Sequence, residues 1–184
     1  MKMLSIFFYR HASWRTLGLA FVAYALFPAL LLPRAEQAIY HAAGKEVGII
    51  DLGIGFDRAK MQQQVANYGE TGRVLYRRTE LTLDIIYPLA YATFFSIVLS
   101  LLMRGLSPDD KLRGANVLPF VVVGFDYLEN ICIVTMLSAY PDWNETTAQL
   151  CALFRLLKWI LFALMGLLIL FLLGRRLLQR RTAV

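Results

Sequence analysis

The sequence predicts an all-α membrane protein, an antiparallel bundle of four transmembrane helices with a partly helical extracytoplasmic loop between helices one and two. Three observations lead to this prediction. The 184 residues, a length that suits a single domain over 1–184, are 58% hydrophobic with mean hydropathy +0.55, well above an ordinary soluble domain. Four apolar runs approach the roughly 20 residues that cross a bilayer. Lys and Arg gather beside these runs, where they act as topology signals.

The first apolar run follows a basic, aromatic N-terminus and extends over about 14–32. Pro28 interrupts the run and Pro33 closes it, so we expect a transmembrane helix that is kinked at Pro28. A cleaved signal peptide is the alternative interpretation. The run is close to full spanning length, and no small-residue cleavage site follows it, which favours the transmembrane helix.

Residues 33–80 form a charge-balanced connection that we expect to fold over the helix ends as an outer cap. The glycine-containing patch Val47–Phe56 is too short to cross a bilayer, which favours an interfacial or re-entrant segment. Asp57 is placed to cap a helix that follows this patch. Gly69 and Gly72 end that helix, and a further long helix then begins.

The remaining spans are expected over about 83–103, 117–138 and 150–173. Basic residues flank the N-terminus, the turn between the second and third spans, and the C-terminus. The loop 139–149 contains no Lys or Arg, and the basic residues of the cap 33–80 are matched by acidic ones. The positive-inside rule therefore places both termini in the cytoplasm and both of these loops outside.

The third span carries polar and charged side chains near its middle. Asp126, Glu129 and Asn130 are spaced by three and four residues, which puts them on one side of a helix. Charged side chains at such depth are costly and normally face the protein interior, where they find a partner. We therefore expect a buried polar cluster here.

Counting about 1.5 Å of helix rise per residue predicts which charges lie at the same depth. Glu129 is level with Lys158 of the fourth span, and Asp84 of the second span is level with Arg155. Asp126 is the deepest carboxylate and remains without a cation. Because desolvation raises the pKa of an unpaired carboxyl group, this residue is the first candidate for an unusual protonation state.

A second polar pattern follows the outer half of the second span. It consists of residues at helical intervals of three or four, namely Arg73, Arg77, Glu80, Asp84, Tyr87 and Tyr91. One interpretation is a helix whose outer end is solvated. The other places Arg73 and Arg77 at the mouth of a cavity, where they hold an anionic headgroup, with Tyr87 and Tyr91 lining the wall.

Several common kinds of site find no support in the sequence. Cys132 and Cys151 form no CxxC motif and differ in expected depth, so we expect free thiols. His11 and His41 both lie outside the apolar runs, so we expect no metal site. We expect no cofactor, because a glycine-rich phosphate loop and a zinc-protease motif are missing. The net charge of +6 indicates contacts with lipid headgroups rather than nucleic acid.

Three functions remain open. The first is binding of a lipid-like or small amphiphilic ligand by the polar cluster, extended to catalysis if Asp126 and Glu129 act as acid and base with Lys158 as electrostatic partner. The second is a non-catalytic structural or accessory subunit whose buried ion pairs fix the packing of the bundle. The third is a proton-coupled transporter or ion path. Expected partners are membrane lipids, a lipid-like ligand, and a second copy of the chain or another membrane protein.

The strings GRVLY, LTLDIIYPLAY, LPFVVVGFDYLEN and LLKWI resemble a group of uncharacterised bacterial four-helix membrane proteins. The residues that carry the likeness are Arg73, Tyr76, Asp84, Tyr87, Pro88, Asp126, Glu129, Asn130 and Lys158. The resemblance covers most of the chain from the outer loop onward. It implies a bacterial inner-membrane protein and brings no activity with it. The layout, with one long outer loop, is also similar in topology to sterol-isomerase-like and sigma-2-type proteins.

Overall fold

The computed structural model describes residues 1–53, 58–106, 111–142 and 144–181, and these ranges contain helices and no strand. The helices are α1 (Lys2–His11), α2 (Trp14–Leu26), η1 (Phe27–Leu31), α3 (Leu32–Ala43), η2 (Ile50–Leu52), α4 (Arg58–Asn67), α5 (Gly69–Glu80), α6 (Leu83–Leu102), η3 (Met103–Gly105), η4 (Lys111–Val117), α7 (Leu118–Ala139) and α8 (Glu145–Arg181). Four helical segments are long and apolar enough to cross a membrane: Trp14–Ala43, Gly69–Gly105, Leu112–Ala139 and Glu145–Leu178. The predicted all-α protein with four spans is therefore confirmed.

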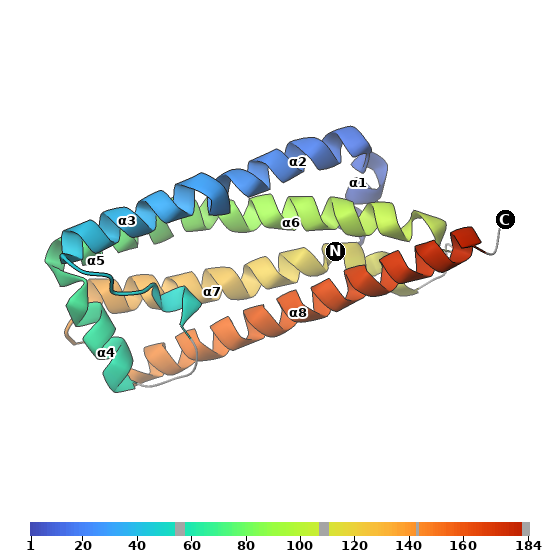
Figure 1. Ribbon diagram of the computed structural model, residues 1–184. Helices are drawn as coiled ribbons and strands as arrows, with labels where there is room; N and C mark the ends of the chain where they lie inside the picture. Colours follow the sequence, from blue (N-terminus) through green and yellow to red (C-terminus); the bar gives the residue numbers. More distant parts are fainter. Residues whose placement is uncertain (54–57, 107–110, 143, 182–184) are drawn as a thin grey trace.

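The four spans lie side by side along one long axis (Figure 1). α2 packs on α6, α6 packs on α7, and α7 packs on α8. At one end of the axis, α3 packs on α5, and α4 contacts both α5 and α8. α8 packs mainly on α7 and less on α6. The first span (α2–α3) and α8 therefore lie on either side of the pair α6 and α7.

The first span is longer than the predicted 14–32, because the helix continues through α3. Pro28 lies in η1, a π-helix of 5 residues, and Pro33 lies in the first turn of α3. The wider π turn accommodates Pro28 without ending the helix, since a single such turn re-routes the interrupted hydrogen bonds. α3 ends at Gly44, whose φ of 70° is a left-handed conformation that favours glycine. The expectation that the helix ends at Pro33 was wrong.

The other predicted boundaries agree better with the structure. α6 and α7 lie close to the predicted 83–103 and 117–138, and Pro88 is accommodated inside α6. α8 extends beyond the predicted 150–173 at both ends. In the patch Val47–Phe56, the described part folds inward and forms the short helix η2. The predicted helix cap Asp57 lies outside the described residues.

The side chains are distributed as expected for a protein with lipid around its spans. Large apolar side chains are exposed on the outward faces of the spans, for example those of Leu19, Val22, Ile131, Leu167 and Leu170. The buried polar and charged side chains lie inside: Glu80, Ser96, Ser100, Asn116, Asp126, Glu129, Asn130, Arg155 and Lys158. A bilayer favours this arrangement, because it solvates apolar groups and leaves charges to be satisfied within the protein.

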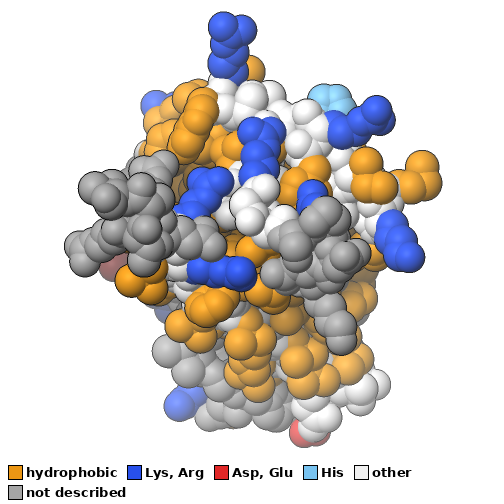
Figure 2. Space-filling model, turned by 90° about the vertical axis from the view of Figure 1, so that its right-hand side faces the viewer, with side chains coloured by type: hydrophobic (Ala, Val, Ile, Leu, Met, Phe, Trp, Pro, Cys, Tyr) orange, Lys and Arg blue, Asp and Glu red, His pale blue; other side chains and the backbone are white. Residues whose placement is uncertain are grey.

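The two ends of the long axis differ in charge. Among the charged side chains, Lys and Arg outnumber Asp and Glu at the end where α1, η3, η4 and the end of α8 meet (Figure 2). Described basic residues of these segments are Lys2, Arg10, Arg104, Arg113, Arg175 and Arg176. This surface is called the basic end below, and the end formed by α3, α4 and α5 is called the capped end.

Candidate functional site

A buried charge cluster joins α7 to α8. Nζ of Lys158 lies 2.6 Å from Oε2 of Glu129 and 3.2 Å from Oδ1 of Asp126. The lysine is 5% exposed and Glu129 is fully buried at 0%. A desolvated charge is tolerated when an opposite charge lies in contact with it, and the single lysine provides that charge to both carboxylates. The predicted pairing of Glu129 with Lys158 is confirmed.

Asp126 has partners for both of its carboxylate oxygens. Lys158 reaches Oδ1, and the hydroxyl of Tyr91 on α6 donates a hydrogen bond of 2.9 Å to Oδ2. The expectation that Asp126 lacks a cation was wrong. The depth count assigned one partner to each cation, whereas the long, flexible stem of a lysine lets its ammonium group reach carboxylates on adjacent turns of the facing helix.

Arg155 has a different partner from the one predicted. Its guanidinium donates to the backbone carbonyl of Ile50, in the part of the cap that folds inward at η2. No ion pair between Asp84 and Arg155 is found within the described ranges, so the predicted pair was wrong. Depth along the helices did not determine this contact, because the cap brings a backbone acceptor into the bundle.

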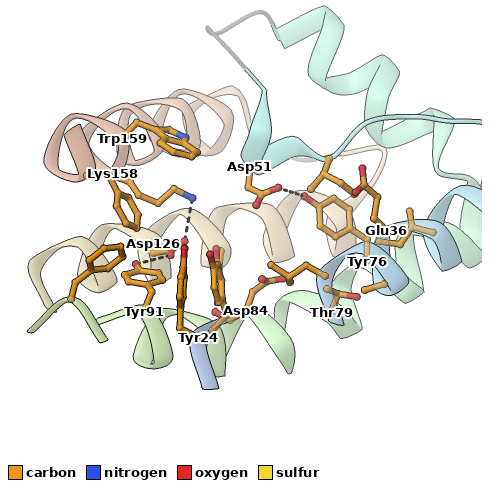
Figure 3. A pocket seen from close by; sticks show the side chains of 18 residues that line it. Tyr24, Glu36, Asp51, Tyr76, Thr79, Asp84, Tyr91, Asp126, Lys158 and Trp159 are labelled. Atoms are coloured by element: carbon orange, nitrogen blue, oxygen red, sulfur yellow. Dashed lines mark hydrogen bonds and ion pairs between the residues drawn. The ribbon is translucent and has the colours of Figure 1, made fainter. Parts of the chain in front are cut away.

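A cavity of about 410 Å³ lies beside the charge cluster (Figure 3). Its lining residues come from α2, α3, α5, α6, α7 and α8, and Asp51 of η2 borders it toward the capped end. Aromatic side chains form a large part of its lining: Tyr24, Tyr76, Tyr87, Tyr91, Phe95, Trp159 and Phe162. Its ionisable lining residues, apart from tyrosines, are Glu36, Asp51, Asp84, Asp126 and Lys158. The cavity therefore combines an apolar, aromatic part with a polar part.

Most of the predicted site residues meet at this cavity. Asp84, Tyr87, Tyr91, Asp126, Asn130 and Lys158 all line it. Asn130 also holds α6 in place, since its Nδ2 donates a 3.0 Å hydrogen bond to the carbonyl of Asp84. Glu129 is not part of the lining and lies behind Lys158. Of the two predicted catalytic carboxylates, only Asp126 is in a position to contact a ligand.

The two arginines of the stripe on the second span lie elsewhere. The guanidinium of Arg73 lies 4.2 Å from the centroid of the Tyr140 ring, and Arg77 donates a 3.4 Å hydrogen bond to Ser138. Both contacts tie α5 to the end of α7. Neither arginine is among the residues that line the cavity. The predicted role of these arginines at the cavity mouth finds no counterpart in this geometry.

Asp51 is a cavity residue that the sequence reasoning missed. It comes from η2, and its Oδ1 lies 3.5 Å from the hydroxyl of the buried Tyr76, which in turn accepts a 3.0 Å hydrogen bond from the amide of Ile50. Burial raises the pKa of Asp51, and Lys158 partly opposes that effect. The available signal was a single carboxylate inside the otherwise apolar patch Val47–Phe56.

Glu80 is buried next to a second, separate groove. Its side chain is 2% exposed, and its Oε2 has no hydrogen-bond partner in the described structure. The groove, of about 350 Å³, lies between the α5–α6 connection and α7, and its other lining residues are mainly apolar. Asn130 lines both the groove and the aromatic cavity, so it forms part of the wall between them.

Comparisons with protein-family models, with curated proteins and with solved structures found no match to this chain. The resemblance to bacterial four-helix membrane proteins therefore stays a prediction. The fold and the site together define the class as a helical membrane protein with four apolar spans and buried ion pairs.

Proposed function

We propose that the protein is an integral protein of the bacterial inner membrane that binds a lipid-like amphiphile in the aromatic cavity. The observation that carries the proposal is the cavity itself. Its volume of about 410 Å³ falls in the range of about 300–1,000 Å³ that is usual for ligand sites. One part of its lining is aromatic and another is charged, which matches a molecule with an apolar body and a polar head.

The proposed orientation is an antiparallel bundle with both chain termini in the cytoplasm. It is supported by the Lys and Arg side chains of the basic end, since positive charge is retained on the cytoplasmic side (Figure 2). The capped end, with the loops 33–80 and 139–149, then faces the other side of the membrane. The cavity lies nearer to the capped end, because η2 of the cap borders it.

If the protein also converts its ligand, the geometry favours Asp126 as the acid or base. A general acid or base must reach the proton that it transfers, and Asp126 lines the cavity. Glu129 does not line the cavity and contacts the same lysine, so its role would be to position Lys158. Asp51 and Asp84 also face the cavity and are further acid–base candidates.

The buried ion pairs support a second candidate, a structural or accessory subunit. Lys158 is in contact with two carboxylates, and Glu129 is completely enclosed, which is an arrangement that fixes α7 against α8 without any ligand. A proton or ion path has less support. Packed apolar side chains fill the bundle between the cavity and the basic end, among them Leu99, Met103, Met165 and Leu172.

The proposed function is tested by identifying what the protein retains when it is purified from membranes in mild detergent. Ala35 lines the cavity, whereas Ala163 is exposed on α8. We expect native mass spectrometry to show a bound amphiphile on the unchanged protein and on Ala163→Phe. Ala35→Phe fills the cavity and should lose the molecule. Equal retention by both variants, or no bound molecule on any of them, contradicts the proposal.

A further inference from the structure

The charges around the cavity are strongly unbalanced. Among the described residues, four carboxylates line it, those of Glu36, Asp51, Asp84 and Asp126, against the single ammonium group of Lys158. Arg155 is near but is not part of the lining, and its guanidinium contacts the backbone of Ile50. The cavity therefore offers more negative than positive groups to any ligand.

Lys158 is not available to hold an anionic head. Its ammonium group lies 2.6 Å from Glu129 and 3.2 Å from Asp126, so two carboxylates already compensate its one charge. An anion in the cavity would have to compete with both of them. It would also meet the other carboxylates of the lining, which repel it.

Among the described residues, the lining carboxylates of Asp51 and Asp84 have neither a cation in contact nor a short hydrogen bond, whereas Glu36 accepts a hydrogen bond from the Tyr40 hydroxyl. Asp84 makes no side-chain hydrogen bond or ion pair with the described residues, while its backbone carbonyl is bound by Asn130. The contact of Asp51 with the Tyr76 hydroxyl is long, at 3.5 Å. They come from different elements, η2 and the first turn of α6, and both border the same space (Figure 3). Carboxylates that are removed from water and left without a cation are costly, and a positive ligand group relieves that cost.

The aromatic wall suits the same kind of ligand. Tyr24 and Tyr87 stack with ring centroids 6.1 Å apart, and Trp159 lies 5.9 Å from Phe162. Electron-rich ring faces attract cations, in particular quaternary ammonium groups, and they also accommodate an apolar chain. The wall thus accepts both parts of a cationic amphiphile.

We propose that the ligand of this cavity carries a positively charged nitrogen, an amine or a quaternary ammonium group, which lies between Asp51 and Asp84 while its apolar part lies along the aromatic wall. This inference rests on the proposed function. It replaces the anionic headgroup that the stripe of arginines suggested, because Arg73 and Arg77 contact the end of α7 and do not line the cavity.

The test uses Trp159 as a reporter, since it lines the cavity and bromine quenches tryptophan fluorescence. The chain with Trp14→Phe and Trp143→Phe keeps Trp159 as its single tryptophan. It is placed in nanodiscs of zwitterionic lipid and titrated with brominated alkyl probes of equal chain length. The probes differ only in the head, which is trimethylammonium, hydroxyl or sulfate. Quenching is corrected for the partition of each probe into empty nanodiscs.

We expect the trimethylammonium probe to bind at least about tenfold more tightly than the hydroxyl probe, and the sulfate probe to bind most weakly. Asp51→Asn combined with Asp84→Asn should lower the affinity for the trimethylammonium probe by about tenfold or more. The same double variant should change the affinity for the hydroxyl probe by less than about twofold. The matched control is Asp142→Asn, which removes the same charge from an exposed position outside the cavity and should leave all three affinities unchanged.

The outcomes separate this inference from the proposed function. Saturable binding without preference for the cation, or with preference for the sulfate probe, overturns the inference and leaves the amphiphile site standing. The three probes are compared on the protein that keeps Asp51 and Asp84. That comparison therefore tests the inference even if the double variant does not fold. Both proposals fail if no probe quenches Trp159 more than its partition into empty nanodiscs predicts, and if adding Ala35→Phe leaves the quenching unchanged.

Discussion

The spans and the cap contain two groups of acidic side chains that differ in how their charge is compensated. In the cluster of Asp126 and Glu129, Lys158 and Tyr91 provide a partner within 3.2 Å for each carboxylate. At the cavity rim, Asp51 and Asp84 have no cation in contact with them among the described residues. The first arrangement holds helices together, whereas the second leaves charge available. Burial of a carboxylate therefore does not by itself identify a binding group, and the absence of an internal partner is the more informative property.

The largest expected effect is at the compensated cluster. Lys158→Met leaves two buried carboxylates without their cation and should destabilise the protein by about 3–5 kcal/mol. Combining it with Glu129→Gln should recover much of that loss, because Asp126 keeps its hydrogen bond from Tyr91. Denaturant unfolding in detergent, analysed as a double-mutant cycle, measures the coupling. Additive effects of the two substitutions would show that the ion pair does not stabilise the fold.

A smaller effect tests the second partner of Asp126. Tyr91→Phe removes the hydroxyl that donates to Oδ2 and keeps the ring packed among its neighbours, so it should cost about 1–3 kcal/mol. Tyr127→Phe is a matched control, since that hydroxyl bonds only to a backbone carbonyl of Ile85 at a more exposed site. Unfolding under the same conditions compares the two variants. An equal loss in both would mean that the charged acceptor adds nothing.

The smallest expected effect concerns the rim and appears as a dependence on pH. Burial raises the pKa of Asp51 in the folded protein; among its neighbours Asp126 reinforces the shift, while Lys158 and the hydrogen bond from Tyr76 oppose it. Between the ordinary aspartate pKa of about 3.9 and the raised value, the folded state binds more protons than the unfolded state. This group therefore lowers stability as pH rises through that interval.

Asp51→Asn removes this loss, because asparagine does not ionise. The variant should match the unchanged protein below the ordinary aspartate pKa and have a higher melting temperature at neutral pH. Melting temperatures measured as a function of pH, with Asp142→Asn as the exposed control, give the comparison. Parallel curves for the unchanged protein and Asp51→Asn would show that the buried carboxylate has little influence on folding.

The sequence was sufficient for features that depend on a single helix or on two facing straight helices. Apolar length predicted the four spans, and counting depth along them predicted the contact between Glu129 and Lys158. The two residues lie well inside regular helices, where rise per residue is constant. The same depth count failed for Arg155, because its partner, the carbonyl of Ile50, belongs to the cap and not to a spanning helix.

The features that the sequence did not predict are a local irregularity in one helix and contacts between distant parts of the chain. Proline signals the end of a helix by removing a hydrogen-bond donor, but the π turn of η1 keeps the first span continuous to Ala43. Asp51 reaches the cavity because η2 folds inward and is held by Tyr76. Local sequence does not indicate the two contacts of η2 with Tyr76, because each joins residues that are distant along the chain.

The dense apolar packing toward the basic end has a consequence for how a ligand would travel. Leu99, Met103, Met165 and Leu172 are almost fully buried and leave the cavity without a continuation in that direction. In the proposed orientation, this packing closes the cavity toward the cytoplasmic side, so a ligand would have to enter it from the outer half of the bilayer. An amphiphile made in the cytoplasm would have to cross the bilayer before this protein can bind it, which gives the site a built-in sidedness.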